Sequence, residues 1–143
     1  MKRLVFIFSA VLMLMGATAS QAAVSQDEVT ADLIKEVNVY RASYGLSPVQ
    51  TSKETCDFAK IRAREIATDF SHEKFKQRYK TGTLPYQPWR EVSENIAMTT
   101  DYKKVISMWA HSRGHAINMR ANTPYVCIAQ YGNYFAYVGM RPK

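Results

Sequence analysis

The stretch YVCIAQYGNYFAYVGM at residues 125–140 decides the fold class of this chain. Both of its halves are rich in β-branched and aromatic residues, which favour β-strands. The dipeptide Gly132-Asn133 lies between the halves and suits the two-residue turn of a β-hairpin. A hairpin closed there places Cys127 opposite Val138. The pattern therefore predicts two antiparallel strands in this stretch.

The chain ahead of the hairpin favours helices. From Val29 to Tyr44, apolar residues recur at intervals of three or four, which predicts a helix over 26–44 that ends at Gly45. The run Thr51-Ser52-Lys53-Glu54 has the pattern of a capping box and predicts the start of a second helix. We expect the buried face of this second helix to consist of Cys56, Ala59, Ala63, Ile66 and Phe70.

The remaining segments are shorter, and we expect a short helix over 71–80, a loop over 81–89, a helix over 101–110 and a turn or short helix over 115–120. Asp101 is the expected N-cap of the third of these segments, and Tyr102, Val105 and Trp109 should face inward from it. Helices followed by a hairpin predict one α+β domain.

The first residues have the layout of a secretory signal peptide. Lys2 and Arg3 precede an apolar run over 4–15, and small residues follow, with possible cleavage after Ala19 or Ala22. The apolar run is short for a membrane span, so we favour a cleaved signal over an uncleaved anchor.

With cleavage after Ala22, residues 1–22 form the signal peptide and residues 23–143 a single mature domain, with no later transmembrane segment. The formal charge of +7 becomes +5, because two basic residues leave with the signal and no acid does. This charge favours anionic surfaces such as wall polymers or phospholipid headgroups, although a merely solvated surface is the favoured explanation of these charges. The bases are scattered and the chain is exported, so we expect no nucleic-acid partner.

Cys56 and Cys127 are the two cysteines of the chain. In an exported protein, an even pair predicts one disulfide, and two buried free thiols are the alternative.

The three histidines form no local catalytic motif. His111 and His115 have the four-residue spacing of two zinc ligands on one helix, but Ser112 stands where a zincin has its glutamate. No G-x-S-x-G elbow surrounds Ser112, which makes it a weak nucleophile candidate. We expect His111 to face solvent. His72, Glu94 and His115 are therefore the remaining candidates, and their spacing alone does not show that they meet.

Four blocks in order resemble the CAP superfamily, the SCP domain of cysteine-rich secretory, antigen-five and pathogenesis-related proteins, in its short bacterial form. They are VNVYRASYGLSP at 37–48, CDFAKIRAREIATDFSH at 56–72, SENIA at 93–97 and WAHSRGHAINM at 109–119. With the hairpin, the resemblance covers about 30–140. It implies an α-β-α sandwich, in which a central antiparallel sheet lies between helical layers.

The resemblance also implies a cleft in which His72, Glu94 and His115 meet. It assigns structural positions near that cleft to Trp109 and Asn118, and it implies that Asn95 fixes the loop that holds Glu94. Two positions depart from the family pattern. Ser93 replaces a usual glycine, and Ser112 stands at the place of the second glutamate of larger eukaryotic members.

Two readings of the cleft follow. A zinc ion held by His72 and His115, with Glu94 and water completing the shell, is one of them. A hydrogen-bonded cluster without metal is the other, and no cofactor is required.

The favoured function is a non-catalytic, monomeric binding module for a lipid, an envelope polymer or a protein ligand. It is secreted or otherwise extracytoplasmic and acts at the cell envelope or outside the cell. The alternative is a peptidase-like hydrolase that uses His72, Glu94 and His115, with or without a metal.

Overall fold

The structure is a computed structural model that describes residues 24–86 and 88–143. The predicted signal peptide and its cleavage site lie outside the described residues. Along the chain the elements are α1 (Gln26–Ala42), α2 (Lys53–Thr68), α3 (Glu73–Thr81), β1 (Trp89–Met98), the 3-10 turn η1 (Tyr102–Lys104), α4 (Val105–Ala110), α5 (Arg113–Arg120), β2 (Tyr125–Tyr131) and β3 (Tyr134–Pro142). Within these residues, no helix combines the length and the apolar character that crossing a membrane requires.

The predicted hairpin is confirmed as β2 and β3, and its register places Cys127 opposite Val138. Gly132 adopts a left-handed backbone with φ +58°, as the tight turn requires. β1 pairs with β3 on the other side, so the antiparallel sheet has the strand order β1-β3-β2.

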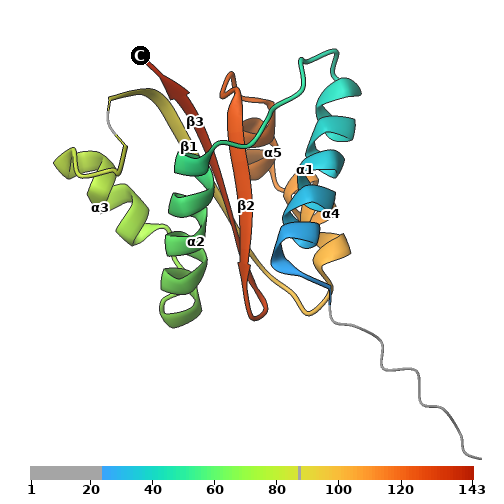
Figure 1. Cartoon of the computed structure of the whole chain (residues 1–143), viewed down its shortest axis with the longest axis horizontal. Coiled ribbons are helices and arrows are strands. Elements are labelled where there is room, and N and C mark those ends of the chain that lie inside the picture. The colour runs from blue at the N-terminus through green and yellow to red at the C-terminus, as the bar shows by residue number, and fades with distance from the viewer. Residues whose placement is uncertain (1–23, 87) are drawn as a thin grey trace, which may run out of the picture.

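Helices cover both faces of this sheet, as expected for an α-β-α sandwich (Figure 1). Alternate strand residues point to opposite faces. On β2, Val126 and Ile128 pack in the core shared with α1, α4 and α5, whereas Cys127 and Ala129 pack in the core shared with α2. Because both faces of the sheet are buried, the sequence of the hairpin is a nearly continuous run of apolar residues.

The helix ends differ in detail from the predictions. α1 ends at Ala42, so the side chain of Tyr44 is exposed rather than buried. Ser52, not Thr51, caps α2, and its partner in the capping box is Thr55 rather than Glu54. The hydroxyl of Thr55 therefore fills the role that the sequence pattern assigned to a carboxylate one residue earlier.

The buried face of α2 also differs from the prediction. Phe70 lies beyond the end of the helix at Thr68 and is exposed. Phe58 and Arg62 are instead fully buried beside Ala59, Ala63 and Ile66. These buried residues recur at helical spacing, and a charged residue occupies one of the core positions.

β1 is the main departure from the sequence analysis. Its residues were divided between a loop over 81–89 and the loop expected to hold Glu94, but they form one continuous strand, WREVSENIAM. The strand lacks a simple alternation of apolar and polar residues, because Ser93, Glu94 and Asn95 are all buried. The side-chain partners of Glu94 and Asn95 come from other elements, so they leave no local signal in the sequence.

The helices after β1 agree with the predictions. The side chain of Asp101 caps η1 by accepting a hydrogen bond from the backbone N–H of Lys103. Trp109 on α4 is 1% exposed, and its indole Nε1 donates to the backbone oxygen of Ile96 at 3.0 Å. This bond joins the helical layer to β1.

Cys56 and Cys127 form a disulfide, as predicted, with their Cα atoms 4.9 Å apart. The alternative of two free thiols is wrong for this structure. The bond closes a sequence separation of 71 residues and ties the start of α2 to the middle of β2.

We predict that the Cys56→Ala/Cys127→Ala variant loses roughly 3–5 kcal/mol of unfolding free energy, because the cross-link restricts the unfolded chain. Urea unfolding of both proteins measures the difference. Equal midpoints, or two reactive thiols per denatured parent chain, would contradict the prediction.

Candidate functional site

The structure brings His72, Glu94 and His115 together. His72 lies between α2 and α3, and its Nδ1 is 2.8 Å from Oε1 of Glu94 on β1. The imidazole rings of His72 and His115 have their centroids 6.0 Å apart. These three residues, which are far apart in the sequence, therefore form a compact cluster.

The cluster wraps around the free edge of β1. Glu94 points to the side of the sheet covered by α2, where it meets Arg62. The next residue, Asn95, points to the other side, where its Nδ2 donates to the backbone oxygen of His115 on α5 at 3.0 Å. Because β3 occupies the inner edge of β1, the two histidines meet only around the outer edge.

Arg62 is the site residue that the sequence analysis missed. Its Nε donates to Oε2 of Glu94, and its Nη2 donates to Oε1 at 3.2 Å. The side chains of Arg62 and Glu94 are each 1% exposed. The sequence did indicate that position 62 is buried, because it lies three residues after Ala59 and four before Ile66, on the buried face of α2.

The ion pair extends into a larger network that we call the charged ring, made of His72, Glu94, Arg62, Glu65 and Arg78. Arg62 also donates to Glu65, and Nη1 of Arg78 donates to the same carboxylate at 2.8 Å. Arg78 lies on α3, which begins directly after His72. α3 therefore closes the ring, and the orientation of His72 depends on α2, α3 and β1 together.

Asn118 and Trp109 cap the outer edge of β1. Nδ2 of Asn118 donates to the backbone oxygen of Glu94 at 2.9 Å and to Oδ1 of Asn95 at 2.8 Å. Trp109 caps the next outward-facing carbonyl, that of Ile96. Both side chains thus hold the backbone under the histidines, and Asn95 lies in a strand rather than in the expected loop.

The two histidines of the cluster differ from His111. Burial, with a smaller contribution from the charge of His72, lowers the pKa of His115, so its ring is neutral near pH 7. The side chain of His72 is 35% exposed. His111 is exposed, and its Nδ1 lies 2.8 Å from the backbone oxygen of Ser107, away from the cluster.

Glu94 does not fit the role of a zinc ligand. Arg62 binds both of its oxygens, and His72 shares one of them. Across residues 24–86 and 88–143, no three His, Cys, Asp or Glu side chains are grouped to hold a metal ion. Glu94 instead resembles a carboxylate that orients a histidine and leaves Nε2 of that ring free. Zinc binding by the two imidazoles alone stays a prediction.

A family profile for cysteine-rich secretory (CAP) proteins matches residues 34–133. No curated protein sequence matches the chain. Among solved structures, an outer surface protein from Borrelia burgdorferi is similar with a TM-score of 0.71 and 17% identity, over 84% of this chain and 97% of that one.

Two larger structures are also similar. An extracellular protein with an SCP domain from Bacillus anthracis has a TM-score of 0.68 and 18% identity, over 85% of this chain and 45% of its own. A cysteine-rich secretory protein from Staphylococcus aureus has a TM-score of 0.64 and 14% identity, over 80% of this chain and 38% of its own. This chain thus spans less than half the length of these two proteins, and at these identities the likeness shows the fold.

We predict that Glu94→Gln lowers the unfolding free energy by roughly 3–5 kcal/mol, because the buried guanidinium of Arg62 loses its more deeply buried carboxylate partner and keeps only Glu65, which Arg78 also binds. The double variant Arg62→Met/Glu94→Met should lose less than Glu94→Gln, since it removes both charges. Urea unfolding measures both changes.

The matched control is Glu73→Gln, because Glu73 is an exposed acid with only a surface pair to Lys76. Its stability should stay within roughly 0.5 kcal/mol of the parent. A Glu94→Gln midpoint equal to that of Glu73→Gln would show that the buried pair contributes little.

The ion pairs of Glu65 predict that the folded protein loses stability at acidic pH. Its hydrogen bond to Arg78, aided by that to Arg62, lowers its pKa from 4.5 to about 2 despite the opposing effect of burial. A carboxylate with a lowered folded pKa stabilises the fold above its unfolded pKa, and this stabilisation is lost as pH falls from about 4.5 to about 2.

The unfolding free energy of the parent, measured in urea, should therefore decrease as pH falls through this range. The decrease should be smaller in Glu65→Gln, which lacks the titrating carboxylate. The difference is on the order of 3 kcal/mol. Parallel pH profiles of the two proteins would rule out this role for Glu65.

Proposed function

Because the chain belongs to the cysteine-rich secretory protein (CAP) family, we propose that it is an exported binding module that acts at the cell envelope or outside the cell without catalysing a reaction. The signal-peptide layout of residues 1–22 supports export. Similar structures include one described as extracellular and one described as an outer surface protein, which is consistent with an extracytoplasmic place for this chain.

The charged ring is the observation that carries the proposal. A hydrolase needs a nucleophile, or a water activated by a base or a metal. Glu94 is the carboxylate nearest the histidines, and Arg62 neutralises it in the interior. Among the described residues, no hydroxyl or thiol is hydrogen-bonded to the ring of His72 or His115. The cluster therefore has an oriented imidazole, and the described residues place no side-chain hydroxyl or thiol beside it as a nucleophile.

The same geometry suits recognition. Glu94 holds the ring of His72 through Nδ1, which leaves Nε2 available on a side chain that is 35% exposed. The ring of His115 lies beside it and also contacts Trp109, at a centroid distance of 6.5 Å. Two positioned imidazoles suit a ligand with a polar head, and the expected ligand remains a lipid, an envelope polymer or a protein.

One observation favours the alternative, a hydrolase. The hydrogen bond between His72 and Glu94 is that of a histidine base with an orienting carboxylate. In that case Nε2 of His72 takes a proton from a bound water, and His115 positions the substrate.

A paired experiment separates the two functions. The parent, His72→Ala/His115→Ala and the matched control His111→Ala are assayed on casein and on peptidoglycan. The same proteins are then incubated with an envelope extract, and bound compounds are identified by mass spectrometry. We expect no turnover above the double variant, and a compound retained by the parent and by His111→Ala but reduced roughly tenfold or more in the double variant.

Turnover by the parent that the double variant lacks would favour the hydrolase. Equal retention of every compound by the parent and the double variant would remove the histidine cluster from ligand binding. Urea midpoints of all three proteins show whether the substitutions leave the fold intact.

A further inference from the structure

A groove separate from the histidine cluster lies between α3 and the first half of β1. A cavity of about 320 Å³ is lined by residues that include Tyr79, Leu84 and Trp89. A second cavity of about 240 Å³ lies between α3 and Val92. Tyr79 and Val92 line both cavities, so the two are adjacent. We call them together the α3–β1 groove.

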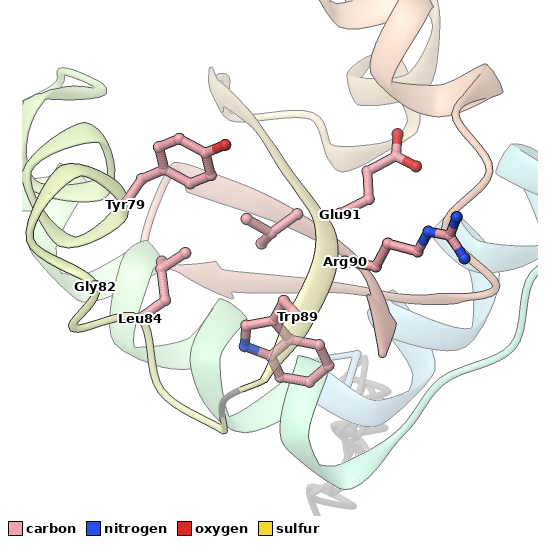
Figure 2. A pocket seen from close by; sticks show the side chains of 7 residues that line it. Tyr79, Gly82, Leu84, Trp89, Arg90 and Glu91 are labelled. Carbon is pink, nitrogen blue, oxygen red and sulfur yellow. The ribbon is translucent and has the colours of Figure 1, made fainter. Parts of the chain in front are cut away.

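One wall of the groove is the outer edge of β1. Figure 2 shows Tyr79 and Leu84 on one side of the strand and the side chains of Arg90 and Glu91 on the other. The apolar side chain of Val92 belongs to the face covered by α2, so it points to the same side as Tyr79.

This part of the edge is open, unlike the part under the histidines. Asn118 and Trp109 cap the outward carbonyls of Glu94 and Ile96. Backbone groups at every second residue of a strand point to the same edge, so those of Val92 also point outward. No described residue makes a hydrogen bond to them. An uncapped stretch of edge strand can pair with another extended chain.

The other wall is α3, which has no buried residue. The ring of Phe75 stacks on Phe58 at a centroid distance of 6.1 Å, and Arg78 binds Glu65, so the helix is anchored on the side toward α2. Tyr79 is 65% exposed. Figure 1 shows α3 at the periphery beside α2. This helix therefore borders the open edge without covering it.

The rim of the groove is positively charged. Lys76 and Lys80 lie one helical turn apart, and both line the second cavity. Lys76 makes an exposed pair with Glu73 at 3.0 Å, whereas Lys80 has no ion pair with any described residue. The groove thus combines an aromatic and aliphatic interior with two cations at its mouth.

We propose that the α3–β1 groove binds an extended peptide segment of another protein, which adds as a strand along the outer edge of β1 at Val92. Every second side chain of the peptide then faces α3. Apolar side chains fill the space beside Leu84 and Trp89, and a carboxylate pairs with Lys76 and Lys80. An acyl chain leaves the backbone N–H and C=O of Val92 unmet, whereas a peptide supplies both partners.

The inference does not depend on the function of the histidine cluster, and the test keeps the two apart. A random dodecapeptide display library is selected on the purified mature chain, and the Lys76→Glu/Lys80→Glu variant serves for counter-selection. Selected peptides are then synthesised and titrated. We expect the selected peptides to carry apolar residues and an acidic residue at every second position, on the side that faces α3, and to bind the double variant roughly tenfold or more weakly. The matched control is Lys74→Glu, an exposed lysine of α3 outside both cavities, which should bind within roughly twofold of the parent.

Backbone pairing has its own readout. N-methylation of alternate peptide residues should abolish binding in one register and change it little in the other, because only one set of N–H groups faces β1. The amide of Val92 should become protected from hydrogen exchange when peptide is bound. The variant His72→Ala/His115→Ala should bind the same peptides as the parent.

Four results would overturn the proposal. They are selection of the same peptides by Lys76→Glu/Lys80→Glu, binding insensitive to N-methylation in either register, loss of binding in His72→Ala/His115→Ala, and lysine-dependent binding to vesicles of equal parts phosphatidylcholine and phosphatidylglycerol without any selected peptide. The last result would assign the groove to an anionic membrane surface.

Discussion

The buried ion pair between Arg62 and Glu94 is the interaction on which the rest of this structure depends. It places two opposite charges, each almost without solvent, between α2 and an edge strand. Such a pair is costly to bury and more costly to break, because either partner alone is an uncompensated charge in the interior. Glu65 and Arg78 extend it to α3, and His72 completes it at the surface. α2, β1 and α3 are therefore held in one arrangement by side chains that are polar rather than apolar.

β1 contributes to both the histidine cluster and the α3–β1 groove, because its outer edge is capped toward one end and open toward the other. Toward its C-terminal end, Asn118 and Trp109 cap the backbone, and two histidines close over it from opposite faces of the sheet. Toward its N-terminal end, α3 stands alongside and leaves the backbone of Val92 open. One strand thus supports both a hydrogen-bonded cluster and an uncapped pairing edge.

The sequence predicted the elements whose signals are local. The hairpin follows from strand-forming residues around Gly132-Asn133, and the helices follow from apolar periodicity. β1 could not be found in this way, because buried Ser93, Glu94 and Asn95 interrupt its apolar pattern. Phe70 was assigned to the buried face of α2 because periodicity does not show that a helix has ended two residues earlier. The histidines and Glu94 were found through resemblance to a family, since their spacing carries no information about contact.

By itself, the sequence determined the α+β class, the helix and hairpin positions, the pairing of Cys56 with Cys127 and the identity of the candidate residues. Only the tertiary structure decided which of those residues meet and which partners each of them has. The family motif alone makes Glu94 a candidate metal ligand. In the structure its carboxylate is bound by Arg62, which lies 32 positions away on another element. Periodicity reports which face of an element is buried, because burial repeats along the chain. The partner of a buried charge is set by how elements pack, and that information is not local to either residue.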